Sequence, residues 1–272
     1  MKTPKLTMND GFTIPQIGLG LWQVKDQAQF DGAFDAAVEA GYRHFDSAQV
    51  YHNEQMFGDA WKRSGLKRED IFITTKIAIN NFGHKAVHES TKASLEKLQT
   101  DYIDLLLLHF PVTILRKKAW TALEEIQKEG GARSIGVSNY TIRHLEELKK
   151  YSNVTPAINQ VELHIFLQQP ELLNYCKEHN IQVEAYSPLA HAHNMDNETV
   201  KTIASKHNKT NAQIMLRWLL QQDLVVLPKS VNPSRIKENI DIFDFSLDQD
   251  DLEKLVQEDK NMRTCWSPVH VP

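Results

Sequence analysis

Four ionisable side chains of this chain lie where they could move a proton. Asp46, Lys76 and His109 each end a short apolar run, and Tyr51 follows Asp46 within one loop. A phenol has an ordinary pKa of ~10 and is a poor acid at neutral pH. A nearby ammonium favours the phenolate and lowers this pKa, while a carboxylate keeps the ammonium protonated and in place. We therefore predict that Asp46, Lys76 and Tyr51 form a relay that delivers a proton to a developing alkoxide.

His109 would add a hydrogen-bond donor that polarises and orients a substrate oxygen. No side chain can supply a hydride, so this set of groups calls for a nicotinamide cofactor. Each residue alone also has a structural explanation, since Asp46 could cap a helix, Lys76 could extend to solvent and His109 could cap a strand. Ionisable groups at the ends of three successive apolar runs instead indicate an active site.

Apolar runs of strand length alternate with amphipathic stretches along the chain. The expected strands are Ile17–Trp22, Arg43–Asp46, Ile71–Lys76, Ile103–His109, Ser134–Ser138, Ala157–Leu163, Gln182–Tyr186 and Leu224–Leu227. Strands that alternate with helices pair in parallel through right-handed crossovers, and eight such units in 272 residues favour a closed (β/α)8 TIM barrel. We expect this α/β fold to form one domain over residues 1–272.

The Asn9–Asp10–Gly11 turn lies between two short runs within Leu6–Pro15 and predicts a β-hairpin. This hairpin is expected to close the bottom of the barrel. The segment Gly18–Leu19–Gly20–Leu21–Trp22 begins like the dinucleotide fingerprint GxGxxG, but it lacks the third glycine and no helix opens there. A doubly wound dinucleotide-binding sheet is therefore disfavoured.

Composition excludes several classes of function. Apolar residues make up 41% and charged residues 24%, the balance of a soluble globular protein, and the net charge of −4 gives no general attraction to nucleic acid or to anionic membranes. The N-terminal residues contain no apolar segment of signal-peptide type, and no run approaches the ~20 apolar residues of a membrane span. A cytoplasmic location is therefore expected.

No metal site and no disulfide framework are expected. The two cysteines, Cys176 and Cys265, are too few and too far apart for either. Five of the twelve histidines lie in polar surroundings without a ligand spacing such as HExxH, namely His84, His88, His191, His193 and His207. Surface or capping roles are predicted for them.

The stretch from Gly41 to Glu54, GYRHFDSAQVYHNE, resembles a signature of the aldo-keto reductase family. Further motifs of that family follow in order, at Leu105–Pro111, Ser134–Asn139, Asn159–Gln160, Tyr186–Leu189 and Pro228–Asn239. The chain is most similar to the compact microbial members, such as 2,5-diketo-gluconate reductases and prostaglandin F synthase-like or glyoxal reductases. The resemblance implies a TIM barrel that reduces small aldehydes and ketones with NADPH.

The resemblance also implies roles for individual residues. The catalytic tetrad would be Asp46, Tyr51, Lys76 and His109, with Tyr51 as the proton donor. The nicotinamide carboxamide would be held by Ser138, Asn139 and Gln160, and Tyr186 would stack on the ring. Ser187 and Leu189 would line the pyrophosphate. The adenosine 2′-phosphate would bind Lys229, Ser230 and Arg235, and the adenosine itself would contact Glu238 and Asn239. The substrate would meet Trp22, Tyr51, His109 and Phe110.

The basic segment also has a physical argument of its own. Lys229 follows the last expected strand, and Arg235 lies near a helix start marked by Asn232 and Pro233, where free N–H groups favour anions. An arginine fork beside an ammonium suits a phosphomonoester. A solvated basic loop is the alternative for this segment alone, but together with the tetrad it favours NADPH over NADH.

Two departures from the family pattern concern the pocket. Phe110 occupies a position often held by Trp, and Ala190 stands where Gly is frequent, while the neighbouring loops are short. These features predict an open pocket, although Trp22 and Phe110 could equally be core residues and Trp266 is a further candidate for the wall. The enzyme is expected to be a monomer. The alternatives are a nicotinamide-binding redox sensor with little turnover, and a barrel hydrolase, which would lack a second catalytic carboxylate.

Overall fold

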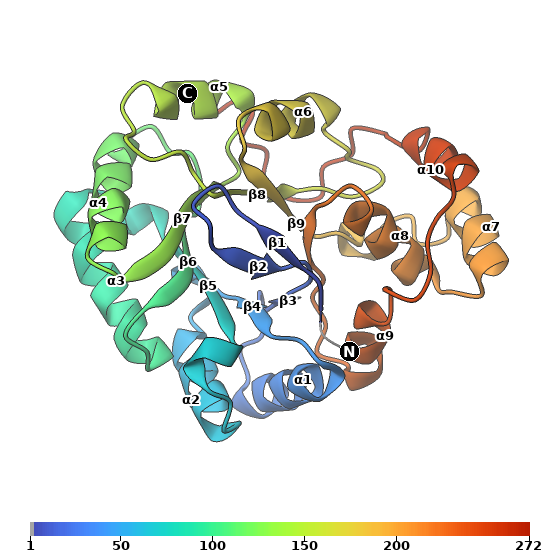
Figure 1. Ribbon diagram of the computed structural model, residues 1–272, viewed down its shortest axis with the longest axis horizontal. Coiled ribbons are helices and arrows are strands. Elements are labelled where there is room, and N and C mark those ends of the chain that lie inside the picture. Colours follow the sequence, from blue (N-terminus) through green and yellow to red (C-terminus); the bar gives the residue numbers. More distant parts are fainter. Residues whose placement is uncertain (1–2) are drawn as a thin grey trace.

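The strands of the computed structural model, which describes residues 3–272, form a parallel barrel inside a ring of helices (Figure 1). The strands are β3 (Leu19–Gly20), β4 (His44–Asp46), β5 (Phe72–Ile77), β6 (Ile103–Leu108), β7 (Ala132–Ser138), β8 (Ile158–Glu162), β9 (Gln182–Tyr186) and β10 (Val225–Leu227). They pair in sequence order from β3 to β10. Gly18 N and Gly20 N donate to the carbonyls of Val226 and Pro228 at 2.9 and 3.0 Å, which brings the first and last strands together. The predicted (β/α)8 barrel is confirmed.

Helices follow the strands and cover the outside of the barrel. The α-helices are α1 (Gln27–Ala40), α2 (Glu54–Arg63), α3 (His84–Leu98), α4 (Arg116–Lys128), α5 (Ile142–Lys149), α6 (Pro170–Glu178), α7 (Glu198–His207), α8 (Asn211–Leu220), α9 (Pro233–Ile240) and α10 (Gln249–Val256). Short 3-10 turns are η1 (Gln49–Tyr51), η2 (Arg68–Asp70), η3 (Ile79–Asn81) and η4 (Ala190–Ala192). None of the helices within residues 3–272 is long and apolar enough to cross a membrane.

The first strand is shorter than predicted. The sequence indicated Ile17–Trp22, but regular pairing covers only Leu19–Gly20, with an isolated bridge from Ile17 to Val226. Glycine within a strand weakens it, and it often occurs where another part of the protein approaches the backbone closely. At Gly18 a Cβ atom would lie 2.6 Å from His44 Nδ1, so this side of the barrel has no room for a side chain.

A hairpin of β1 (Lys5–Thr7) and β2 (Thr13–Pro15) lies across one end of the barrel in Figure 1. Its turn contains Gly11, whose φ of 86° is the left-handed conformation that glycine adopts without strain. Met8 and Ile14 pack in one buried cluster with residues in or beside the barrel strands, most of which lie near the strand starts. These are Phe72, Leu105, Leu107, Ala157, Ile158 and Val225. The hairpin thus closes the bottom of the barrel, as predicted.

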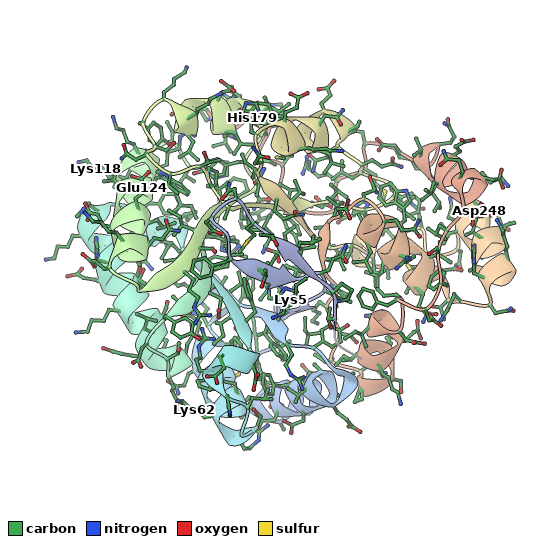
Figure 2. All side chains as sticks on the ribbon, in the orientation of Figure 1. Lys5, Lys62, Lys118, Glu124, His179 and Asp248 are labelled. Atoms are coloured by element: carbon green, nitrogen blue, oxygen red, sulfur yellow. The ribbon has the colours of Figure 1, made fainter. Side chains whose placement is uncertain are left out.

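The barrel interior changes from apolar to polar along the strands. In β6, Leu105 and Leu107 belong to the inner cluster, whereas Leu106 and Leu108 pack in the larger cluster with the helices. Above the inner apolar layer the strands carry buried polar groups, among them Thr74, Lys76, Asp46, Gln160 and Glu184. Figure 2 shows labelled charges such as Lys62, Lys118 and Asp248 on the outer surface. The buried charged residues Asp46, Lys76 and Glu184 therefore differ from most charged residues of the chain, and their position indicates a functional site.

Candidate active site

The side chain of Lys76 is the centre of the buried polar group. Its Nζ donates to Asp46 Oδ1 at 2.5 Å, to the Ser47 carbonyl at 2.9 Å and to Tyr51 Oη at 3.3 Å. Lys76 is fully buried, so these three acceptors match the three protons of the ammonium. Asp46 ends β4 and Lys76 lies near the end of β5, which brings both to the C-terminal mouth of the barrel. The structure thus assembles the three residues of the predicted relay.

Burial and charge set opposite trends for the ionisation of these groups. Burial disfavours the Lys76 ammonium, but attraction to Asp46 and Tyr51 outweighs this and raises the pKa of Lys76 above its ordinary value. For Tyr51, burial raises the pKa, and Lys76 reverses only part of that rise. The predicted lowering of the Tyr51 pKa is therefore wrong, because burial and Lys76 together leave the pKa above its ordinary value. The phenol keeps its proton at neutral pH and can donate it.

His109 lies directly after β6 and faces the ring of Tyr51. The two ring centroids are 5.8 Å apart at an interplanar angle of 77°. Burial, with a contribution from the Lys76 charge, lowers the pKa of His109 to about 3. The imidazole is therefore neutral at physiological pH and can donate a hydrogen bond without carrying a charge.

Two amide side chains position the turn that ends in Tyr51. Gln49 Oε1 accepts a hydrogen bond from Ala78 N at 2.9 Å, which ties the turn to the end of β5. Asn53 is fully buried, and its Nδ2 donates to the Leu21 carbonyl at 2.8 Å. Gln49 and Asn53 had no role predicted from the sequence. Both residues lie two positions from Tyr51 within the Gly41–Glu54 signature, and this proximity could have indicated that they position Tyr51.

A second carboxyl lies beneath the tetrad. Gln160 Nε2 donates to Asp46 Oδ2 at 2.8 Å and to Glu184 Oε2 at 2.7 Å. Glu184 also lies 3.6 Å from His44 Nε2, and both side chains are fully buried. Glu184 was not predicted from the sequence. One signal in the sequence could have identified it. Glu184 is the acidic residue two positions before Tyr186 in β9, and alternate residues of a strand share one face, so Glu184 faces the same side as Tyr186.

The buried carboxyl of Glu184 predicts a pH-dependent stability. Burial raises the pKa of Glu184 to about 8, and repulsion from Asp46 adds to the rise. Folding therefore favours the protonated form, so the stability that this group contributes is full below its unfolded pKa and is lost as the pH rises towards 8. Glu184→Gln has no carboxyl at this position, so its free energy of unfolding should not fall for this reason as the pH rises. The difference in free energy of unfolding, variant minus wild type, should therefore increase by up to ~1.4 kcal/mol per pH unit between about pH 5 and 8.

Urea unfolding of both proteins at several pH values across that window measures this difference. His44, whose pKa burial lowers to about 3, is present in both proteins, so its own contribution largely cancels. A difference that is constant with pH would mean that Glu184 is ionised throughout the window.

The residues predicted to hold the nicotinamide lie beside the tetrad. Ser138 ends β7, and Asn139 follows it with a left-handed φ of 66°. Asn139 Nδ2 donates to the His109 carbonyl at 3.0 Å, and Tyr186 Oη donates to Asn139 Oδ1 at 2.7 Å. The structure therefore brings these three residues and Gln160 together at the mouth, and their role towards a cofactor stays a prediction.

The loop after β9 has an unusual backbone. Ser187, Ala190, His191 and Ala192 all have positive φ values, from 48° to 64°. Ala190 therefore occupies a left-handed position where a glycine would be unstrained, which accounts for the frequent Gly there. Ser187 Oγ lies 3.0 Å from His191 Nε2, and Leu189 is half-buried beside the core.

The predicted 2′-phosphate residues lie at the start of α9. Lys229 and Arg235 are exposed, and neither forms an ion pair with any residue in the range 3–272. Asn232 caps the helix by accepting from Ser234 N at 2.9 Å. These side chains, with Ser230, are available to an anion. Of the two residues predicted to reach adenosine, Glu238 accepts from Thr210 Oγ1 at 2.7 Å and Asn239 is buried.

The candidate pocket walls differ in exposure. Trp22 is 42% exposed and Trp266 is 84% exposed, so neither belongs to the core, and Phe110 is half-buried. The Trp22 ring packs edge-on against His191 at 5.5 Å. The C-terminal segment is anchored at the mouth by Glu162, which accepts from Thr264 N and Oγ1, both at 2.6 Å. Glu162 was not predicted from the sequence.

Comparison with known proteins agrees with this geometry. The sequence pattern of the aldo/keto reductase family matches residues 16–260. The glyoxal reductase of Bacillus subtilis (strain 168) is 44% identical over 261 residues, covering 96% of this chain and 95% of that protein. Methylglyoxal reductase DkgA of Escherichia coli (strain K12) is 45% identical over 267 residues, covering 97% and 96%.

A solved structure extends the likeness to three dimensions. The aldo-keto reductase of Bombyx mori, determined in complex with NADP, has a TM-score of 0.92 and 34% identity, and the match covers 97% of this chain and 95% of that chain. Similarity in sequence and in fold thus spans nearly the whole chain. The chain belongs to the aldo/keto reductase family.

Proposed function

We propose that this protein reduces small aldehydes and ketones to alcohols with NADPH. The observation that carries the proposal is the buried Lys76 ammonium, held between the Asp46 carboxylate and the Tyr51 phenol. This arrangement holds a protonated phenol next to a positive charge that would stabilise the phenolate formed when the proton leaves. When bound, NADPH would supply the hydride, which no side chain carries.

Each residue of the tetrad has a distinct task in this proposal. Tyr51 donates its proton to the substrate oxygen as negative charge develops there. Lys76 stabilises the phenolate, and Asp46 holds the ammonium in position and protonated. His109, neutral because burial lowers its pKa to about 3, donates a hydrogen bond that orients the same oxygen. Asp46 does not contact the substrate in this proposal and acts only by holding Lys76.

The donor set at the mouth fits a nicotinamide dinucleotide phosphate. Ser138, Asn139 and Gln160 offer hydroxyl and amide groups for the carboxamide, and Tyr186 offers a ring whose hydroxyl is fixed by Asn139. Ser187 and Leu189 would border the pyrophosphate. The 2′-phosphate would bind the exposed Lys229 and Arg235 and the half-buried Ser230 near the start of α9. Asn232 already accepts from the first N–H groups of this helix, so the charged side chains would supply the attraction. Glu238 and Asn239 would border the adenosine.

The substitution Arg235→Ala tests the assignment of the 2′-phosphate. Loss of a charge-assisted hydrogen bond costs about 1.5–3 kcal/mol, so the KM for NADPH should rise roughly 10- to 100-fold. The KM for NADH, which lacks this phosphate, should change little. Steady-state kinetics with both cofactors measure the effect, and Lys237→Ala, on the same helix, is the matched control. Equal effects on both cofactors would remove Arg235 from this role.

The substrate class follows from the pocket and from the relatives. Trp22 and Phe110, with Tyr51 and His109, would border an open site suited to small carbonyl compounds, and two relatives are named for the reduction of glyoxal and methylglyoxal. Every proposed residue comes from one chain, so we propose that a monomer suffices.

A panel of carbonyl compounds tests the proposed function. The protein is mixed with NADPH and each compound, and loss of the reduced cofactor is followed by absorbance. Many turnovers with small aldehydes or dicarbonyls are expected. Tight NADPH binding without turnover would favour a redox sensor instead, and cleavage of esters or glycosides without cofactor consumption would favour a hydrolase.

A further inference from the structure

Two histidines and a glutamate form a cluster on the outer helices of the barrel. His84 Nε2 lies 2.7 Å from Glu125 Oε2, and His88 Nε2 lies 3.1 Å from the same oxygen. The three potential ligand atoms all lie within 4.8 Å of one another. None of these residues belongs to the tetrad or to the proposed cofactor site.

The helices hold these side chains on facing surfaces. His84 and His88 are four residues apart in α3, which places both on one face, and their ring centroids are 5.1 Å apart. Glu125 lies on α4, which runs beside α3 (Figure 1). Glu125 Oε2 lies within hydrogen-bond distance of both Nε2 atoms, so the packing of the two helices brings the three potential ligand atoms together.

We propose that His84, His88 and Glu125 bind a divalent transition-metal ion that links α3 to α4. Two imidazole nitrogens and one carboxylate oxygen suit zinc, cobalt, nickel or copper, whereas calcium and magnesium prefer all-oxygen sites. Zinc binds such ligands at about 2.0–2.2 Å, which sets neighbouring ligand atoms of a tetrahedron about 3.3 Å apart. The contacts of 2.7 and 3.1 Å require only small side-chain movements to reach that spacing. Water would complete the fourth position.

The cluster is accessible to an ion from solvent. The side chains of His84, His88 and Glu125 are 50%, 30% and 44% exposed. His88 also lines a cleft of about 490 Å³ between α3 and α4, together with Lys92, Leu95 and Ile126. The site therefore has an entry path and room for a metal-bound water.

Sequence spacing could not reveal this site. The two histidines have the i, i+4 spacing of a metal pair, but the third ligand lies 41 and 37 residues further along the chain. Only the packing of α3 against α4 brings Glu125 to them. The expectation that His84 and His88 have surface or capping roles did not take this neighbour into account.

Titration of the full-length protein with zinc, after removal of metals with a chelator, tests the proposal. Isothermal titration should detect one ion per chain, and cobalt should give the visible absorption bands of a site with nitrogen ligands. Each of His84→Gln, His88→Gln and Glu125→Gln should weaken zinc binding at least ~10-fold, since each removes one ligand. Glutamine keeps hydrogen-bonding capacity between the helices, so the variants should fold.

His270→Gln is the matched control, because it removes an exposed imidazole outside the cluster. It should bind zinc as the wild type does. A triple variant combines His84→Gln, His88→Gln and Glu125→Gln. A zinc concentration about 100-fold above Kd should raise the Tm of the wild type by about 5 °C and leave that of the triple variant unchanged. The rate of NADPH-dependent carbonyl reduction without metal should be the same in all variants.

Two results would overturn the proposal. One is zinc binding of undiminished affinity in the triple variant, which would place the ion elsewhere. The other is the absence of one-to-one binding in the wild type, which would leave the cluster as a surface hydrogen-bond network only. Thermal unfolding of the metal-free variants separates a folding defect from a lost ligand, since each should unfold within about 2 °C of the wild type.

Discussion

Tyr51→Phe is expected to lower kcat by roughly 10²- to 10⁴-fold, because the variant has no proton to give to the developing alkoxide. The substitution removes only the hydroxyl, and the remaining ring can keep the edge-on packing against His109. The affinity for NADPH should stay within about two-fold of wild type, since no proposed cofactor contact involves the Tyr51 hydroxyl. Steady-state kinetics with a small aldehyde measure the first effect, and a fluorescence titration with NADPH measures the second.

Tyr102→Phe is the control for this substitution. Tyr102 lies just before β6, where its ring packs against the guanidinium groups of Arg68 and Arg133 at 3.9 and 4.0 Å. That ring remains in the variant, so activity should be that of the wild type. An undiminished rate in Tyr51→Phe would remove Tyr51 from the role of proton donor.

Lys76→Met is expected to destabilise the fold and to abolish turnover. The substitution leaves the buried Asp46 carboxylate without its cation, and breaking a buried pair in this way costs about 3–5 kcal/mol. Turnover should be lost because nothing then stabilises the phenolate of Tyr51. Urea unfolding and steady-state kinetics measure the two effects.

A double variant separates charge from geometry. Adding Asp46→Asn to Lys76→Met removes the uncompensated charge, so most of the lost stability should return. Turnover should not return, because the ammonium is still missing. If the single and double variants unfold at the same urea concentration, Asp46 is not charged in the single variant and the ion pair is weaker than its geometry indicates.

Local pattern was sufficient for most of the architecture. Alternating apolar runs and amphipathic stretches predicted the eight strands, and β9 has the predicted bounds, Gln182–Tyr186. The hairpin about Gly11 was equally evident, because few residues other than glycine take its turn conformation at no cost. The family signature from Gly41 to Glu54 pointed to the reaction class, since it combines Asp46 and Tyr51 in one loop.

Other features arise only when the barrel closes. Gln160 meets Asp46 across 114 residues of sequence, and Glu184 joins the same network from the next strand. The close approach of His44 to Gly18, next to the short strand β3, is a further contact that no local pattern reports. Such contacts depend on strand register and on which residues share the inner face.

The ionisation of the site also depends on the tertiary structure. From residue types alone, Lys76 was expected to lower the pKa of Tyr51, but burial in the barrel mouth outweighs that charge and raises it. The sequence therefore identifies which groups meet at the strand ends, because each strand's last residues are encoded locally. The fold determines how deeply they are buried and which distant partners they contact, and these two quantities set their protonation at neutral pH.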